Sequence, residues 1–305
     1  MKRYFAYPVI FLSIILGYIF PEGKVLKWSI PYLLAILLFL AFIKIDFRFS
    51  DLRRRELLLY AILSILIMPA LTFFIFKNLF PFEFRIGLFL LSCIPIALAM
   101  SGIIDLLPQG DQRLVLSITI VFTLSSAFYI PVLIFIYFST YISINITGLF
   151  FNLIIIIFLP WATAEIFKRY IKKVFISYIS RYSFIINFIV LFIIIYVSVS
   201  GARDKISLNL SMFYLFLAVL AISIVHGTIA YIFARIFDAK HEPSFTLISA
   251  SKNTQLGLLI ALMNFGEKAA IPTVLGIIAN HLTYSILLII FHLTRKPELL
   301  KDEIE

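Results

Sequence analysis

The chain has 305 residues, of which 62% are hydrophobic and only 14% are charged. A soluble domain of this length does not need so much apolar surface, and apolar runs of about 20 residues recur along the chain, so the composition excludes a soluble globular protein. The net charge of +10 does not indicate nucleic-acid binding, because the basic residues lie in short segments between apolar runs, where they set membrane orientation. The single cysteine, Cys93, excludes an internal disulfide and a cysteine-built metal site.

Ten apolar segments are long enough to be membrane spans, and proline, glycine or charged residues separate them. The predicted spans run approximately over residues 4–20, 28–46, 56–78, 84–107, 112–138, 147–168, 177–199, 209–236, 244–265 and 269–294. With the N-terminus placed inside, eighteen of the 26 basic residues fall in inside loops and seven in outside loops. This bias predicts a multi-pass protein of the cell (inner or plasma) membrane with both termini in the cytoplasm. The first run lacks a small-residue cleavage site, so it is predicted to be a span and not a signal peptide.

The chain also shows a weak internal repeat, in which the segment 90–111 is similar to the segment 247–267. In each, an apolar run reaches a small or polar break, resumes for about ten residues and ends at glycine plus an acid. The repeat predicts two copies of five spans, approximately 4–138 and 147–295, within one membrane domain over 1–305. An odd number of spans inverts the second copy, and inverted repeats with paired broken helices are typical of secondary transporters. The alternative is a chance match of two helices rich in leucine and isoleucine.

The middle of the ninth predicted span is polar, although apolar residues flank it on both sides. The polar residues there are Ser249, Ser251, Lys252, Asn253, Thr254 and Gln255. A charge at the bilayer centre costs from ~3 to more than 10 kcal/mol, so such a segment is stable only where the helix breaks and its backbone lines a cavity. We therefore predict that Ser251 to Gln255 contact a substrate. The alternative for Asn253, Thr254 and Gln255 is that they only satisfy backbone groups freed by the break.

The stretch SKNTQLGLLIALMNFGEKAAIPTVLGIIANHLTYSILL (residues 251–288) resembles the crossover and following helix of the bile acid:sodium symporter family. The fourth and fifth spans are similar to that family at Cys93, Pro95, Ser101, Gly110-Asp111, Thr119 and Pro131, and the segment DFRFSDLRRRE also fits. The resemblance implies ten helices in a core bundle (spans 3–5 and 8–10) and a panel (spans 1, 2, 6 and 7). It also implies that spans 4 and 9 cross, unwound, at the membrane midplane, with Pro95 and Ser101 at the crossover.

The chain departs from this family at the sodium sites, which draw on a Ser-Asn pair, a glutamate and two glutamines. The corresponding positions here are Ser101-Gly102, Ile248, Lys252 and Ser64. Only Ser101, Thr119 and Thr123 remain as candidate oxygen ligands. A hard cation in a dehydrated site needs several oxygens and usually a carboxylate. The sequence therefore predicts no cofactor and weakens the case for sodium coupling.

Lys252 suggests a replacement for the ion, because an ammonium is itself a monovalent cation. Its position at the start of the resumed half-helix sets it against the positive end of the helix dipole, so a negative group should offset it. Our hypothesis is that Lys252 replaces sodium at the crossover, paired with Asp105 when empty and with an anionic substrate when occupied. The alternative is a purely structural Lys252–Asp105 ion pair. His226 and His281 are expected to hydrogen-bond between helices and not to carry protons, although proton coupling through the lysine stays open.

These features predict a secondary transporter that moves a small organic anion or amphipathic acid across the lipid bilayer by alternating access. The sequence does not choose between a monomer and a homodimer, and it predicts no nucleic-acid partner. An intramembrane enzyme is disfavoured, because no span holds a His-Glu-x-x-His motif, an Asp-rich diphosphate motif or a cluster of carboxylates or histidines. Two alternatives stay open, a carrier of a neutral or metalloid solute and a sensor-like relative that binds a ligand without moving it.

Overall fold

The computed structural model describes residues 6–44, 54–98, 100–107, 110–141, 145–205, 209–239 and 241–294. The elements within these ranges are helices, joined at one place by a single antiparallel bridge. Seven helical segments of the described residues are long and apolar enough to cross a membrane. The prediction of an all-helical, multi-pass membrane protein is thereby confirmed, whereas the count of ten spans stays a prediction.

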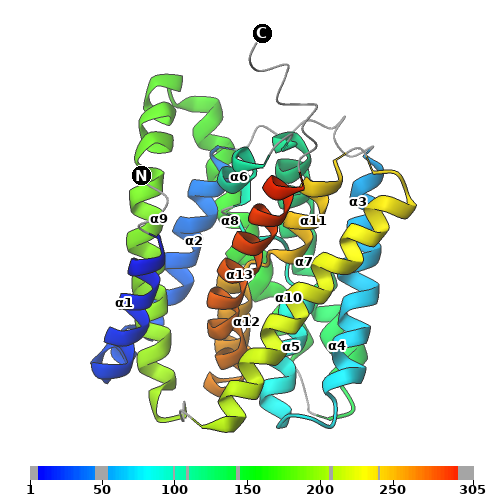
Figure 1. Ribbon diagram of the computed structural model, residues 1–305. Helices are drawn as coiled ribbons and strands as arrows, with labels where there is room; N and C mark the ends of the chain where they lie inside the picture. The colour runs from blue at the N-terminus through cyan, green and yellow to red at the C-terminus, as the bar shows by residue number, and fades with distance from the viewer. Residues whose placement is uncertain are drawn as a thin grey trace.

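The elements follow one another with short connections (Figure 1). Up to the middle of the chain they are α1 (Ala6–Ile19), η1 (Pro21–Ser29), α2 (Ile30–Phe42), α3 (Arg55–Ala61), η3 (Ile62–Ile67), α4 (Met68–Phe76), α5 (Phe82–Cys93), α6 (Met100–Ile103), η4 (Ile104–Leu106) and α7 (Gln112–Phe138). After it they are α8 (Ile146–Tyr170), α9 (Lys173–Ala202), η5 (Arg203–Lys205), α10 (Leu210–Ile236), α11 (Glu242–Ala250), α12 (Thr254–Asn264) and α13 (Glu267–Leu293). The fourth and ninth predicted spans are thus each divided into two helices.

The rod formed by α3, η3 and α4 is continuous but changes its winding, because η3 is π-helical. The N–H of Met68 donates to the carbonyl of Leu63, five residues back, and Pro69 follows directly. A proline inside a helix lacks an N–H and crowds the preceding turn, and a π-helical turn is one way to accommodate it. Ser64 lies within this widened turn, which is a common position for functional residues in membrane helices.

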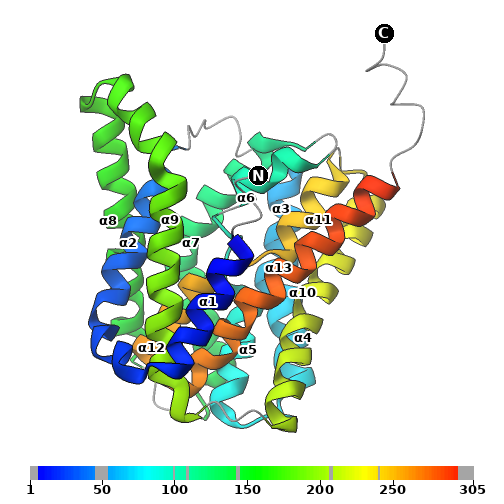
Figure 2. The same ribbon diagram turned by 60° about the vertical axis from the view of Figure 1, so that its left-hand side comes forward.

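The helices pack into two groups, seen side by side in Figures 1 and 2. We call the group of α1, η1, α2, α8 and α9 the panel, and the group of α3 to α7 and α10 to α13 the core. Contacts of α7 with α8, of α13 with α9 and of α12 with α2 and α8 join the two groups, and those of α7 with α8 are the most extensive. An ion pair between Lys27 of η1 and Glu267 at the start of α13 also links the panel to the core.

Close contacts around α13 fix the centre of the core. A Cβ atom on Gly87 of α5 would overlap the carbonyl oxygen of Ala269 and the ring of Pro272. A Cβ atom on Gly276 would overlap Leu91 and lie only 3.0 Å from Cγ2 of Thr254. Small residues permit such close packing of membrane helices. The start of α12, and with it the break after α11, is therefore held directly against α13.

Candidate functional site at the helix breaks

The two helix breaks of the core lie against each other and satisfy each other's backbone. The N–H of Ala97 donates to the carbonyl of Ser251 (3.2 Å), and the N–H of Asn253 donates to the carbonyl of Pro95 (2.8 Å). Ile96 and Lys252 therefore face each other as an antiparallel bridge. Within a membrane, backbone groups freed by a break need partners of this kind, because no lipid group can supply them.

Local sequence explains why the helices end here. Pro95 disfavours a helical conformation of the residue before it, and Ile94 is extended with ψ 149°. In the other break, Ser251 is extended, and Asn253 caps α12 by accepting a hydrogen bond from the N–H of Leu256 at its side-chain oxygen (3.1 Å). Asparagine is among the preferred residues at this capping position. The polar stretch thus ends one helix and begins the next.

The main chain of Lys252 is held from a third helix. Asn280 of α13 accepts a hydrogen bond from the Lys252 N–H (3.3 Å) and donates its side-chain N–H to the Lys252 carbonyl (2.6 Å). Asn280 is buried, with 6% of its surface exposed. One amide thus pairs with both backbone groups of the residue, so the backbone of Lys252 is fixed by contacts that do not involve its side chain.

The side chain of Lys252 is buried among three polar or aromatic side chains from two other helical rods. Its Nζ lies 3.2 Å from Nε2 of His226 on α10 and 3.4 Å from Oγ of Ser64 in η3. The Ser64 hydroxyl also lies 3.1 Å from the same His226 nitrogen. The ammonium is 5.4 Å from the centre of the Tyr60 ring, where a cation–π interaction stabilises it. We call Lys252, His226 and Ser64 the crossover cluster.

The predicted ion pair between Lys252 and Asp105 does not form. Asp105 is exposed in the 3-10 turn η4, whereas Lys252 is only 1% exposed, and no ion pair among the described residues includes Lys252. The resumed helix α6 is only four residues long, so Asp105 lies past its end, nine residues beyond the contact of Ile96 with Lys252. The carboxylate keeps its water there and avoids the large cost of burial.

Some of the other predicted substrate residues hydrogen-bond to the protein backbone, and one has a buried polar atom without a hydrogen-bond partner. The Ser251 hydroxyl donates to the carbonyl of Leu247 (2.9 Å), and Pro95 contributes its carbonyl to the joined breaks. Asn253 caps α12 with its oxygen, but its side-chain nitrogen is buried and has no hydrogen-bond partner. Thr254 is buried and Gln255 is half-buried in the first turn of α12. Buried donors without partners are uncommon, so the Asn253 side-chain nitrogen is an unusual group in this site.

The candidate sodium ligands form an incomplete site. Thr119 donates its hydroxyl to the carbonyl of Val115 (2.7 Å), and the Thr123 hydroxyl, one turn further along α7, is buried without a partner. Ser101 lies in α6, and its side chain falls outside the described part of the structure. Ile248, at the position that the resemblance assigns to a glutamate, is a fully buried aliphatic residue. Two threonine hydroxyls without a carboxylate are a poor fit to a dehydrated hard cation.

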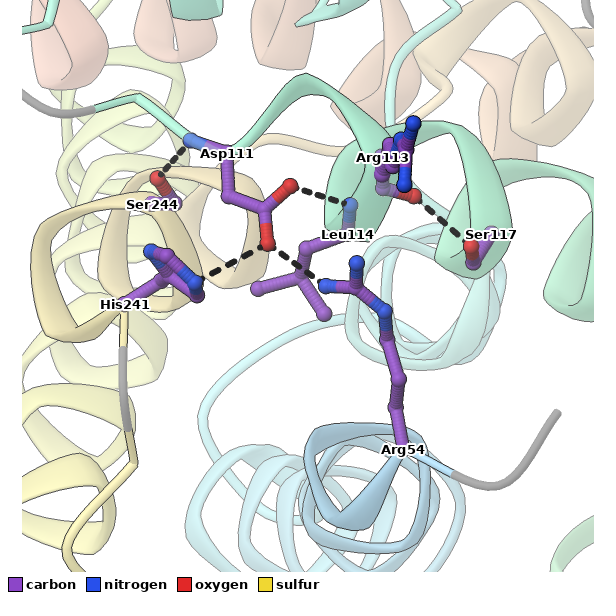
Figure 3. A network of polar contacts seen from close by, with 7 residues as sticks. All are labelled: Arg54, Asp111, Arg113, Leu114, Ser117, His241 and Ser244. Carbon is purple, nitrogen blue, oxygen red and sulfur yellow. Dashed lines mark hydrogen bonds and ion pairs between the residues drawn. The ribbon is translucent and has the colours of Figure 1, made fainter. Parts of the chain in front are cut away.

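A second polar network, at the end of the core where α3, α7 and α11 begin, is built around Asp111 (Figure 3). Arg54 donates to Oδ2 of Asp111 (2.5 Å), and His241 Nε2 lies 3.2 Å from the same oxygen. Oδ1 accepts from the N–H of Leu114, and the Asp111 N–H donates to the Ser244 hydroxyl (2.9 Å). We call these contacts the Asp111 network.

The charge of the Asp111 carboxyl is stabilised by this network. Partial burial by itself would raise its pKa, but the hydrogen bonds from Arg54 and Leu114 and the charges of Arg54 and His241 outweigh burial, so the pKa lies below its ordinary value. The sequence signal for the network is the Gly110-Asp111 pair directly before a helix, since aspartate is a preferred N-cap. Its partners, 57 and 133 positions away along the chain, have no comparable signal.

Similarity to known proteins covers most of the chain. A family model described as the Sodium Bile acid symporter family matches residues 31–209. A relative named "Uncharacterized sodium-dependent transporter YocS", from Bacillus subtilis (strain 168), is 22% identical over 286 residues, which cover 90% of this chain and 86% of the relative. The family match includes Ser64 and the break after α5 but ends before His226 and Lys252.

Proposed function

The chain belongs to the Sodium Bile acid symporter family, and from this membership we propose that it is a secondary transporter of a small organic anion or amphipathic acid. The observation that carries the proposal is the Lys252 ammonium, buried where two helix breaks join and not paired with a carboxylate among the described residues. A cation in such a place is stabilised when an anion binds beside it. The unpartnered side-chain nitrogen of Asn253 offers that anion a further hydrogen-bond donor.

The proposed architecture is one domain over 1–305 with ten spans in two inverted repeats, approximately 4–138 and 147–295. The broken spans are then α5 with α6 and α11 with α12, crossing at the midplane. The division of the helices into panel and core supports this layout, because alternating access needs two groups that move against each other. The excess of basic residues on one side supports cytoplasmic termini in the cell membrane.

We further propose that Lys252 takes the place of sodium at the crossover. The resemblance assigns two family sodium ligands to the positions of Ser64 and Lys252, and here these two residues contact each other. The ammonium would then pair with the substrate anion when the site is occupied. Ser251, Thr254 and Gln255 are proposed to line the same site. Ser101, Thr119 and Thr123 are the residual candidates for sodium, which the relative's name includes as its coupling ion.

Counterflow in proteoliposomes tests the transport proposal. Vesicles loaded with unlabelled taurocholate, and others loaded with a neutral steroid glycoside, receive the labelled compound outside. We expect saturable, protein-dependent exchange of the anion, unchanged in Lys24→Met, which removes an exposed lysine away from the site. Exchange of the neutral compound at an equal rate would assign a neutral solute to the site. Saturable binding without exchange would identify a ligand-binding relative that moves nothing.

Thermal stability tests the exchange of lysine for sodium. The wild type and Lys252→Gln are titrated with sodium against potassium at constant ionic strength, because an ion that binds only the folded state raises the melting temperature by mass action. We expect the wild type to ignore sodium and Lys252→Gln to gain a sodium-specific rise. A sodium-specific rise in the wild type would mean that the residual oxygens still bind the ion and that Lys252 does not replace it.

A further inference from the structure

We propose that the Lys252–His226 pair binds the proton that drives transport, so that each organic anion crosses the membrane together with one proton. The inference rests on the proposed function and adds its coupling ion. It starts from a contact between two basic side chains, Lys252 in the break after α11 and His226 of α10, whose Nζ and Nε2 atoms are 3.2 Å apart and almost fully buried.

The contact limits how many protons the pair holds. A protonated lysine carries three donors and no acceptor, and a protonated histidine carries two donors and no acceptor. A hydrogen bond between Lys252 and His226 therefore requires a lone pair on at least one of them. Two positive charges at this distance would also repel each other strongly in a poorly hydrated site. The pair thus has one charged form, with a single added proton, and one neutral form.

The surroundings do not neutralise the charged form. Among the described residues, the titratable side chains near the pair are Tyr60 of α3 and Cys93 at the end of α5. Tyr129 of α7 lies next to Cys93, because its hydroxyl donates to the Cys93 carbonyl. Phenols and thiols carry no charge at neutral pH. On α13, Asn280 bonds the Lys252 main chain, and His281 bonds the Ile277 carbonyl of its own helix. Among the described residues, the charged pair therefore has no negative partner.

A buried cation without a partner is relieved in two ways, by losing its proton or by gaining an anion. These two events are linked, because an anion that binds only the charged form raises the proton affinity of the pair by the factor by which the proton raises the anion affinity. The loaded site holds one positive and one negative charge, and the empty site holds neither. Both forms that cross between the two sides are then neutral, which avoids moving an uncompensated charge through the membrane.

Ser64 and the second nitrogen of His226 complete the proton site. The Ser64 hydroxyl lies 3.4 Å from Lys252 Nζ and 3.1 Å from His226 Nε2, so its oxygen is a second acceptor for the N–H groups of Lys252. Nδ1 of His226 is buried and has no hydrogen-bond partner. When the lysine is charged and Nε2 accepts from it, Nδ1 carries the imidazole proton. The ring is thus oriented with its lone pair toward Lys252.

Proton movement is measured in proteoliposomes that contain the dye pyranine, with the membrane potential clamped and sodium absent. Taurocholate and a panel of aliphatic and aromatic sulfonates are the probes, because a sulfonate stays ionised and cannot cross the bilayer as a neutral acid. We expect protein-dependent acidification of the lumen at one proton per anion. An imposed pH gradient should accumulate the anion about tenfold per pH unit, the equilibrium ratio for one-to-one symport.

The possible outcomes separate the two proposals. Anion flux without acidification, or flux driven only by a sodium gradient, overturns proton coupling and leaves the transporter intact. Absence of protein-dependent flux for the whole panel overturns the proposed function and this inference with it. Lys252→Met should abolish acidification, and His226→Gln should shift the pH of half-maximal acidification by about one unit or more, within the range by which neighbouring groups change proton affinity. Lys24→Met should change neither.

A measurement without any substrate covers the case in which the variants fail to fold. The chain has four histidines, so nitrogen-15 histidine spectra of the wild-type protein in lipid nanodiscs are simple enough to assign. Single substitutions of His241, His281 and His292 identify the other three signals, so the remaining signal belongs to His226. We expect a neutral ring with Nδ1 protonated and Nε2 unprotonated at neutral pH. A doubly protonated His226 under these conditions would contradict a pair that shares one proton through Nε2.

Discussion

The crossover cluster and the Asp111 network contain similar polar side chains, but only the Asp111 network contains a carboxylate. Each joins a strong base, a histidine and a serine from different elements of the core, Lys252 with His226 and Ser64 in one and Arg54 with His241 and Ser244 in the other. The Asp111 network also has a carboxylate at its centre, and the crossover cluster has none. The network therefore balances its own charge, whereas the positive charge of the cluster, when present, has no negative partner among the described residues. On the proposed function, this difference distinguishes a structural site from a binding site.

Giving the crossover cluster a carboxylate should erase this difference. In Ser64→Asp, the new carboxylate would pair with Lys252 and compete with the substrate anion. We expect counterflow to slow about 10- to 100-fold, the equivalent of one lost charged hydrogen bond of ~1.5–3 kcal/mol, while the protein keeps its thermal stability. Ser64→Asn, of similar size without charge, is the control. Equal loss in both variants would show that the added volume, and not the charge, blocks the site.

Removing the amide that holds the Lys252 backbone should destabilise the protein. Asn280→Ala leaves the buried N–H of Lys252 without an acceptor, whereas the carbonyl still accepts from the N–H of Thr254 (2.9 Å). The expected loss in the free energy of unfolding is about 1–3 kcal/mol. Asn264→Ala is the matched control, since that amide bonds only the carbonyl of Ile260 in its own helix. Equal melting temperatures of the two variants would rule out a special role of Asn280.

Removing the carboxylate from the Asp111 network is the converse change. Asp111→Asn keeps an oxygen for the N–H of Leu114 but leaves Arg54 and His241 without a negative partner. Because these two side chains are 24% and 36% exposed, water screens part of the loss, and we expect a decrease of about 1–2 kcal/mol in the free energy of unfolding. Transport at neutral pH should fall less than in Ser64→Asp. A loss of transport as large as in that variant would mean that the network is part of the transport site.

Acidification should remove the contribution of the Asp111 carboxylate to the free energy of unfolding without a mutation. In the unfolded chain, the Asp111 carboxyl titrates near its ordinary pKa of about 3.9, and in the folded protein its pKa is lower. The stabilisation is therefore complete above the ordinary pKa and is lost as the pH falls through the lowered one. The difference in melting temperature between the wild type and Asp111→Asn should be present at about pH 5 and shrink below about pH 4. A difference that persists into strong acid would contradict this origin.

Local sequence predicted much of the site. The polar residues from Ser251 to Gln255 marked the break between α11 and α12, because a polar stretch inside an apolar run cannot continue as a lipid-facing helix. Asn253 and Asp111 lie at helix starts, where their side chains cap the backbone. Each of these features depends on neighbours within a few positions, so the sequence alone contains the necessary information.

The partners of Lys252 could not be predicted in this way. Ser64 and His226 lie 188 and 26 positions away, and their contact with the lysine depends on how α10 and η3 pack against the break. The contact with Asn280 could not be predicted for the same reason, since Asn280 lies 28 positions from Lys252 on another helix. Asp105 was assigned to the lysine because it is the only carboxylate well inside its predicted span. The early end of α6, which a sequence pattern does not fix to within one turn, places it at the surface instead.

The double hydrogen bond between Asn280 and the backbone of Lys252 bears on how this family changes over evolutionary time. Asn280 and the opposite break hold the backbone at position 252 through contacts that do not involve its side chain. One substitution there could exchange an ion ligand for a residue that carries its own charge, with the crossing of the helices left in place. Under the proposed exchange of lysine for sodium, a change of coupling ion needs no new backbone contact, so the residue at this position is the first to compare when the coupling of related transporters is sorted.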